Sequence, residues 1–269
     1  MQDPPPHKPL KIVVLTQDDR VYLPIPIGSL VGANPARVSC IILAPPMSTH
    51  GGRMKGLLKH LPVFGVHGTI RMGWRVIWSY IGPKLGLRPS GREYWSIEEV
   101  GKRLGVETFR VDKVNSKEMH AILDEHPADL LASVSCPQIV RPEILSRFTH
   151  GGINVHSAPL PRYRGLLPSF WVLHNGEQET AVTVHDLAEK LDNGDILVQQ
   201  SIPIAKGETW NTLLLKTKVA AGEALITAVE AFENGTVTRT ANRDEDSTYF
   251  SFPSWKDARS FRSRGLRMF

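Results

Sequence analysis

This sequence of 269 residues has few of the features that mark secreted, metal-binding or membrane-spanning proteins. Its only two cysteines, Cys40 and Cys136, stand far apart and match no spacing of metal ligands, so we expect free thiols in a reducing cytoplasm and no metal site. No run of about 20 apolar residues occurs, and the first residues are polar and rich in proline. We therefore expect no signal peptide, no membrane-spanning helix and no membrane partner.

The chain also lacks a strong excess of charge of either sign. Its 32 Lys and Arg outnumber its 27 Asp and Glu by five, which allows a phosphate-bearing substrate but gives no support for a nucleic-acid partner. Hydrophobic residues make up 41% and charged residues 22%, as is typical of a globular protein. Many loops are expected from the 22 Gly and 20 Pro.

The first predicted elements indicate an α/β fold. Residues 10–16 and 37–43 are mostly apolar runs typical of buried parallel strands, and a helix is predicted between them at 24–31. This order implies a right-handed crossover in an open sheet. Further strands are predicted at 107–111, 128–134, 152–156, 181–187 and 196–204, and helices at 96–104, 116–125, 142–148, 168–173 and 209–234. We therefore predict an open, mostly parallel, twisted sheet with helices on both faces. No Gly-x-Gly-x-x-Gly follows the first strand, which removes the main support for a dinucleotide site.

Four parts of the chain can be expected from its composition. A flexible tail (1–9) precedes a main domain (10–235), which contains a helical insertion after the second strand (about 45–96). A C-terminal arm (236–269) rich in aromatic residues and arginines follows. The arm can lie over a substrate pocket, contact a partner or pack as a simple tail.

The insertion carries apolar residues at helical spacing. They form one stripe, Val66, Ile70, Trp74, Ile77, Trp78 and Ile81, and Pro83 and Gly86 are expected to end the helix. The preferred interpretation is a helix that covers the sheet or makes a homodimer contact. A second interpretation is a wall beside the substrate, whose arginines (Arg71, Arg75, Arg88 and Arg92) bind a phosphate. A helix on a membrane surface ranks third.

The strongest candidate for chemistry lies between residues 151 and 194. Asn154 and His156 are two residues apart in a short predicted strand, so both side chains point to the same face where the strand ends. The proline-rich run that follows forces a turn. Asp192 in a later Asp-Asn-Gly turn can then join them. An amide, an imidazole and a carboxylate together can polarise a carbonyl and move a proton.

These residues also carry a resemblance to a known family. Asn-Val-His, then Leu-Pro-Arg-Tyr-Arg-Gly, then Leu-Asp-Asn-Gly-Asp-Ile-Leu resembles the signature of the formyltransferases that use 10-formyltetrahydrofolate. That family includes methionyl-tRNA, glycinamide-ribonucleotide and sugar-nucleotide formyltransferases. The likeness covers roughly residues 10–235, which would be the catalytic domain, and is strongest at 130–197. Three motifs in the right order are far more specific than any one of them.

The resemblance implies a Rossmann-like formyltransferase fold and a role for several further residues. The loop after the strand at 128–134 would hold the pterin of the folate, together with the turn residue Leu191; its residues are Ser135, Cys136, Pro137, Gln138, Ile139 and Val140. The acceptor side would involve Gln17, Asp18, Arg162, Tyr163, Arg164 and His185, the last with a structural role as the alternative. Ala158 and Pro159 depart from the family, which usually has Ser and Leu there.

The expected function follows from the three candidate catalytic residues and the resemblance. We expect an N-formyltransferase that moves a formyl group from 10-formyltetrahydrofolate, without a metal, to the primary amine of a small metabolite. A nucleotide-linked amino sugar is the acceptor we consider first. The alternatives are hydrolysis of 10-formyltetrahydrofolate, formylation of methionyl-tRNA and a non-catalytic binding protein with the same fold.

Overall fold

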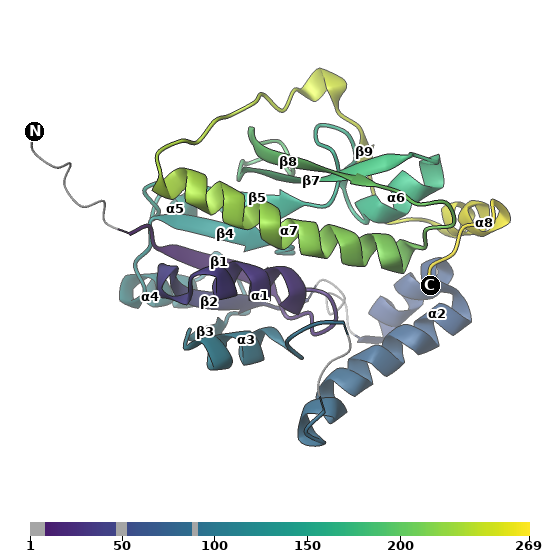
Figure 1. The fold of residues 1–269 in the computed structure, drawn as a ribbon, viewed down its shortest axis with the longest axis horizontal. Helices are drawn as coiled ribbons and strands as arrows, with labels where there is room; N and C mark the ends of the chain where they lie inside the picture. The colour runs from purple at the N-terminus through teal and green to yellow at the C-terminus, as the bar shows by residue number, and fades with distance from the viewer. Residues whose placement is uncertain (1–8, 47–52, 88–90) are drawn as a thin grey trace, which may run out of the picture.

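The fold is built on a seven-stranded sheet (Figure 1). The computed structural model describes residues 9–46, 53–87 and 91–269, with side chains from residue 60 onward in the second of these ranges. The strands lie in the order β3-β2-β1-β4-β5-β7-β8. Their bounds are β1 Ile12–Gln17, β2 Val38–Ala44, β3 Thr108–Arg110, β4 Leu130–Val134, β5 Gly152–His156, β7 Glu179–Asp186 and β8 Ile196–Pro203. The first five in this order are parallel, whereas β7 runs antiparallel to β5 and to β8. The predicted open, mostly parallel α/β sheet is therefore confirmed.

Apolar side chains cover both faces of the central strands, because successive residues of a strand point to opposite sides. Val14 belongs to one hydrophobic cluster and its neighbour Val13 to another. The first cluster is closed by α1 (Pro24–Ala33), α3 (Ile97–Leu104), α6 (Pro168–Asn175) and α7 (Trp210–Glu233). The second is closed by α4 (Lys117–Glu125) and α5 (Pro142–Leu145). The continuous apolar runs in the sequence thus reflect strands buried on two sides.

Helix α2 (Arg53–Lys84) contradicts one of the two preferred interpretations of the insertion, coverage of the sheet, and leaves the homodimer contact a prediction. Its backbone is non-helical at Gly65, with φ 66° and ψ 174°. The side that faces the body carries small residues: Gly68 lies against Phe269 and Gly82 against the ring of Trp95. The apolar stripe is therefore on the opposite side, where Trp74 is 63% exposed. The prediction that the stripe covers the sheet is wrong, because these small residues, rather than the large apolar ones, form the packing face.

The C-terminal arm packs on the body. Strand β9 (Tyr249–Phe250) pairs in parallel with β6 (Arg164–Gly165), and α8 (Trp255–Ser263) follows. Phe261 of α8 is 1% exposed and stacks on Phe170 of α6 with a centroid distance of 4.6 Å. The arm thus crosses the segment that follows β5 and fixes it to the body. The division of the chain into four parts remains a prediction.

Candidate active site

Strands β5 and β7 bring three of the predicted residues to one face of the sheet. Asn154 of β5 pairs with His185 of β7, and His156 pairs with Thr183. Paired residues in an antiparallel ladder point to the same side, so Asn154, His156 and His185 gather there. His156 and His185 are buried, at 8% and 2% exposure, whereas Asn154 is partly exposed.

Both nitrogens of His156 face oxygen atoms. Its Nε2 lies 2.8 Å from the backbone carbonyl oxygen of Tyr163, which can only accept, so Nε2 carries a proton and donates it. Its Nδ1 lies 3.7 Å from Oδ2 of Asp192. A protonated ring would therefore find an acceptor on each side, and this arrangement fixes the orientation of the imidazole.

Asp192 lies between the two histidines. Its Oδ1 is 3.8 Å from Nε2 of His185, and its Oδ2 accepts a hydrogen bond from the backbone amide of Gly165 at 3.0 Å. The side chain is buried, and the backbone is left-handed with φ 52°. The carboxylate therefore comes within reach of the imidazole of His156, as the sequence predicted for these two groups.

His185 supports Asn154 in this arrangement. Its Nδ1 lies 2.8 Å from the backbone carbonyl oxygen of Asp186, which requires a proton on Nδ1. The neutral ring then leaves Nε2 free to accept from Nδ2 of Asn154 at 3.1 Å. Burial lowers the pKa of His185 to about 4, against the opposing effect of the Asp192 carboxylate. A neutral His185 therefore orients the Asn154 amide.

Left-handed backbone conformations concentrate around this site. Among the described residues, the four non-glycine residues with positive φ are Ser135, Tyr163, Leu167 and Asp192. Such a conformation costs roughly 1–2 kcal/mol for a residue with a side chain. Ser135 follows β4, Tyr163 and Leu167 flank β6, and Asp192 lies in the turn between β7 and β8. Strained backbone that gathers at the ends of neighbouring strands is typical of functional sites.

The C-terminal arm holds both segments of the site. Asn242 is 7% exposed, and its Nδ2 donates to the carbonyl oxygens of Asp192 and Gly194 at 2.9 and 3.0 Å. Its Oδ1 accepts from Arg164 at 2.8 Å, and the Arg164 guanidinium also pairs with Asp244 at 2.6 Å. Asn242 was not predicted from the sequence, since a single polar residue in a segment without periodicity gives no signal.

The predicted folate loop after β4 is held by its neighbours. Gln138 accepts from the amide of Val114 at 3.0 Å and donates to the carbonyl of Asp112 at 3.0 Å. The carbonyl of Ile139 accepts from Asn115, whereas the Ile139 side chain is 63% exposed. Burial raises the pKa of the Cys136 thiol to about 11, so this thiol is un-ionised at neutral pH. Pro137 is only partly buried and Val140 is buried, while Leu191 in the turn before Asp192 is 52% exposed.

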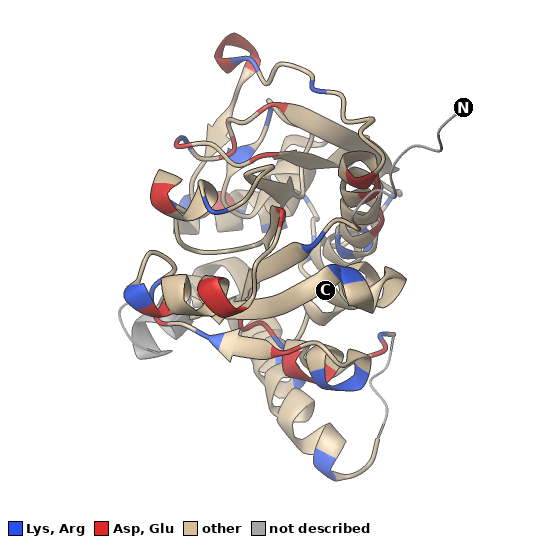
Figure 2. Ribbon diagram, turned by 90° about the vertical axis from the view of Figure 1, so that its left-hand side faces the viewer, with Lys and Arg blue, Asp and Glu red and all other residues tan. Residues whose placement is uncertain are grey.

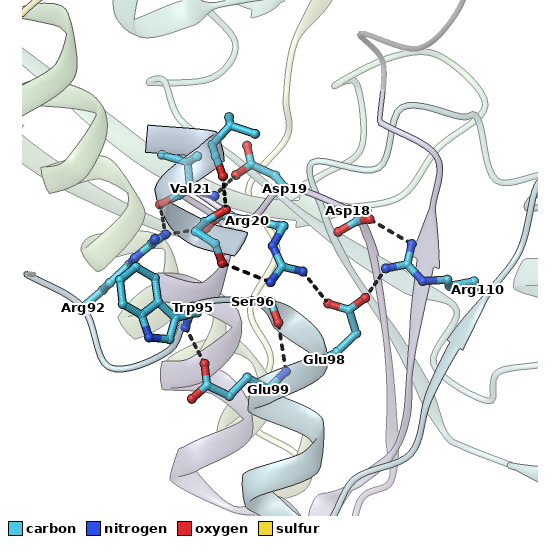
Figure 3. A network of polar contacts seen from close by, with 12 residues as sticks. Asp18, Asp19, Arg20, Val21, Arg92, Trp95, Ser96, Glu98, Glu99 and Arg110 are labelled. Carbon is cyan, nitrogen blue, oxygen red and sulfur yellow. Dashed lines mark hydrogen bonds and ion pairs between the residues drawn. The ribbon is translucent and has the colours of Figure 1, made fainter. Parts of the chain in front are cut away.

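The predicted acceptor residues have different surroundings. Gln17 ends β1, and Asp18 pairs with Arg110 at 2.8 Å in a network that includes Arg20 and Glu98 (Figure 3). Arg162 is exposed and pairs with Glu177 at 3.3 Å. Tyr163 and Arg164 are buried; the Tyr163 hydroxyl donates to Glu177 at 2.7 Å. These polar groups thus interact with other residues of the chain. Their contact with an acceptor remains a prediction.

The arginines proposed as a phosphate-binding wall are also engaged. Arg92 donates to the backbone carbonyls of Arg20 and Val21 (Figure 3), and Arg75 donates to Asn211. Arg71 lies over the ring of Phe269, 5.3 Å from its centroid. Arg88 lies outside the described residues. The contacts of Arg71 and Arg75 fix α2 to the body, and none of the contacts described supports a phosphate-binding wall.

A partly buried lysine at the edge of the sheet was also not predicted from the sequence. Lys218 of α7 places its Nζ 3.4 Å from Oγ of Ser135, at the carboxyl end of β4. Burial lowers the pKa of this amine, and the carboxylate of Asp19 opposes that effect. Its place on a helix that is otherwise amphipathic gave no reason to single it out. When protonated, an amine at this edge of the sheet is suited to an anionic group of a ligand.

Comparison with known proteins identifies the family. Residues 90–229 match the family model described as formyl transferase. The chain belongs to the formyl transferase family. A curated relative, a methionyl-tRNA formyltransferase from Anaeromyxobacter sp. (strain K), is 34% identical over 154 residues, which are 56% of this chain and 49% of the relative. The chain thus spans about half the length of that relative. The predicted membership of the formyltransferases is confirmed.

Solved formyltransferase structures share the fold of this family member. Glycinamide ribonucleotide transformylase 1 from Symbiobacterium toebii is 18% identical with a TM-score of 0.60, covering 87% of this chain and 92% of that one. The sugar 3N-formyltransferase WlaRD, solved with dTDP and 5-N-formyl-THF, is 17% identical with a TM-score of 0.58, covering 95% of this chain and 79% of that one.

In the described part of this chain no helix is long and apolar enough to cross a membrane.

Proposed function

We propose that this formyltransferase moves the formyl group of 10-formyltetrahydrofolate to the primary amine of a small, phosphate-bearing acceptor such as a nucleotide-linked amino sugar. The observation that carries this proposal is the meeting of three side chains: the Asp192 carboxylate lies 3.7 Å from the His156 imidazole, next to Asn154 on the same face of the sheet. These are the groups that transfer of a formyl group between two nitrogens requires.

The reaction exchanges one carbon–nitrogen bond for another. The amine nitrogen attacks the formyl carbon, negative charge develops on the formyl oxygen, and the bond to N10 of the folate then breaks. One proton must leave the amine and one must reach N10. The Nδ2 of Asn154 has two hydrogens, and His185 accepts one of them, so the other is available for the developing oxyanion. Loss of such a donor typically raises the barrier by about 3 kcal/mol.

His156 and Asp192 would handle the proton. Nε2 of His156 is held by the carbonyl of Tyr163, so transfer involves Nδ1, which faces Oδ2 of Asp192. The carboxylate stabilises the imidazolium that forms when Nδ1 takes the proton. The same nitrogen can then return it toward the leaving N10, directly or through a water held by Asp192.

The predicted folate loop has features that suit a pterin ring. Its backbone is fixed by Gln138 and Asn115, so its amides and carbonyls have defined directions. Ile139 and Leu191 expose large apolar side chains on the two segments that would flank the ring. An aromatic ligand gains affinity by covering such side chains. WlaRD was solved in the presence of a formylated folate, 5-N-formyl-THF, which supports the same cosubstrate class here.

The acceptor class rests on two observations. WlaRD, a sugar 3N-formyltransferase solved in the presence of dTDP, shares its fold with 95% of this chain. Lys218 and Ser135 place an ammonium and a hydroxyl at the carboxyl edge of the sheet, where a phosphate could bind. Methionyl-tRNA is kept as a second acceptor because the curated relative is a methionyl-tRNA formyltransferase.

The test is an acceptor screen with purified protein and 10-formyltetrahydrofolate. The acceptors are dTDP- and UDP-linked amino sugars, glycinamide ribonucleotide and methionyl-tRNA, and mass spectrometry detects addition of one formyl group. We expect formylation of a nucleotide-linked amino sugar. His156→Ala should lower kcat by about 10³-fold or more, within the usual range for general acid–base groups.

The variants separate the roles of the three residues. Asp192→Asn keeps a residue that tolerates the left-handed backbone and removes only the charge. His120→Ala on α4 is the control and should retain wild-type activity. Formate release at the same rate with and without any acceptor would show a hydrolase instead. Formyl transfer that survives His156→Ala, or no turnover of any formylated folate, would refute the proposal.

A further inference from the structure

Helix α2 exposes a long apolar stripe that no described part of the chain covers. The exposed residues lie on one side of the helix: Val66 (69%), Ile70 (66%), Trp74 (63%), Ile77 (48%), Trp78 (37%), Ile81 (41%) and Leu85 (61%). The rings of Trp74 and Trp78 stack, with centroids 6.2 Å apart. From Val66 to Lys84 the helix is about 28 Å long at 1.5 Å per residue. A continuous apolar surface of this size indicates a docking surface.

The stretch of sequence that contains the stripe carries charge of one sign. No Asp or Glu occurs from Arg20 to Arg92, whereas ten Lys and Arg do. The rest of the chain carries the other 22 Lys and Arg and all 27 Asp and Glu, for a net charge of −5. The helix that extends below the body in Figure 2 accordingly shows blue segments and no red one. On α2, Arg71 lies next to the stripe and Lys84 within it, and both are exposed.

This charge pattern decides between two occupants of the stripe. In a symmetric dimer the stripe of one copy would meet the same stripe of the other, which carries no carboxylate, so Arg71 and Lys84 would gain no acidic partner from it. An anionic bilayer offers the opposite charge, and each Lys or Arg near such a surface contributes about fivefold in affinity. Stacked tryptophans beside aliphatic residues are also suited to the boundary between headgroups and acyl chains.

We propose that the apolar stripe of α2 docks on the surface of an anionic phospholipid bilayer, with the helix lying in the plane of the interface. The small residues on the opposite side keep α2 attached to the body, through Gly68 against Phe269 and Gly82 against Trp95. Docking therefore requires no unfolding. The proposal is contrary to the expectation of no membrane partner, and it favours the interpretation of the stripe that ranked third.

The attachment of α2 determines which edge of the protein would face the bilayer. Arg20, in the loop after β1, donates to the carbonyl of Ser79 at 3.3 Å and lies over the ring of Tyr80, 4.2 Å from its centroid. That loop follows the carboxyl end of β1, and Figure 1 shows α2 beside this edge of the sheet. The bilayer would thus lie next to the edge that carries the candidate site.

Flotation with lipid vesicles tests the proposal on the full chain. One set of vesicles contains only phosphatidylcholine, and the other contains equal parts of phosphatidylcholine and phosphatidylglycerol. We expect binding to the anionic vesicles, weakened by salt, and a blue shift of tryptophan emission. Trp74→Ser should reduce binding on the order of tenfold. Lys84→Gln should reduce it about fivefold.

The matched control is Trp255→Ser, which removes an equally exposed tryptophan (66%) from α8 and should leave binding unchanged. Circular dichroism shows that each variant is folded. No binding to anionic vesicles, equal binding to both kinds of vesicle, or equal losses for Trp74→Ser and Trp255→Ser would overturn the proposal. So would sedimentation showing a lipid-free dimer that Trp74→Ser dissociates, because the stripe would then belong to a second copy.

Discussion

Asn242 is expected to act on catalysis through the position of Asp192. Its amide donates to the carbonyls of Asp192 and Gly194, and its oxygen accepts from the Arg164 guanidinium. Two hydrogen bonds between neutral groups contribute about 1 kcal/mol each, and one to a charged group contributes about 1.5–3 kcal/mol. Asn242→Ala should therefore lower the free energy of unfolding by roughly 3–5 kcal/mol.

A protein with a stability of about 10 kcal/mol, in the middle of the usual range, stays folded after this loss, so activity can still be measured. Once its anchor is removed, the left-handed turn at Asp192 can relax toward a less strained backbone, and the carboxylate moves away from His156. We expect kcat to fall by about 10²-fold, the usual effect of a misplacement near 1 Å. KM for the folate should change less than kcat, because the predicted loop after β4 is held by other residues and only Leu191 of the predicted folate site lies in the turn that relaxes.

A double-mutant cycle provides the decisive measurement. If Asn242 acts through Asp192, then Asn242→Ala should reduce kcat far less in an Asp192→Asn background than in the wild type. Leu225→Ala is the control for stability: this residue of α7 is fully buried, and its truncation costs about 2–5 kcal/mol by leaving a cavity in the core and removes no polar contact. Equal effects of Asn242→Ala on kcat in both backgrounds, or a fall in kcat for Leu225→Ala of the same size, would refute the reasoning.

Three further predictions concern other residues of the site. Gly194→Ala should destabilise the protein and lower kcat, because a Cβ there would lie 1.9 Å from the carbonyl oxygen of Asp186. Gly32→Ala in α1, with open space around it, should leave kcat unchanged and keep or slightly raise the free energy of unfolding. Between about pH 6.5 and pH 4, His185 binds a proton in the unfolded state but not in the folded state, because its folded pKa is about 4. The free energy of unfolding should therefore fall as the pH is lowered through this range, by up to about 3 kcal/mol. Urea unfolding of His185→Gln should show a flatter pH dependence, and an unchanged slope would contradict the pKa of about 4. Lys218→Met should raise KM for a phosphate-bearing acceptor about tenfold or more and leave KM for the folate unchanged; equal changes in both would contradict an acceptor role.

The sheet could be predicted because its strands carry strong local signals. The apolar runs at β1, β2 and β4 are buried on both faces, and such runs are readable without any long-range information. The shared face of Asn154 and His156 also follows from strand geometry alone. The approach of Asp192 to His156 depends on a turn far along the chain. It could be predicted mainly because the motif that contains Asp192 resembles that of the family.

Other features could not be predicted because they depend on long-range contacts. A periodic stripe shows that a helix has an apolar face, but it does not show which face packs against the rest of the protein. In α2 the packing face is the one that carries the small residues Gly68 and Gly82. The support of Asn154 by His185 depends on the antiparallel register of β5 and β7, beside a register shift in the pairing of β7 with β8. A single-residue change in that register would have turned His185 to the other face.

The candidate site and the proposed docking helix are connected through the loop after β1. Arg20 of this loop contacts α2 at Ser79 and α3 at Glu98, and Tyr22 donates to Asn211 of α7. The loop is therefore held by three helices, and α2 cannot move without disturbing it. Because the stripe points away from these contacts, a bilayer can bind α2 and leave the geometry around His156 unchanged. Docking would then bring the edge of the sheet that carries the candidate site close to a surface without altering the geometry of that site, so substitutions should separate membrane binding from the proposed formyl transfer.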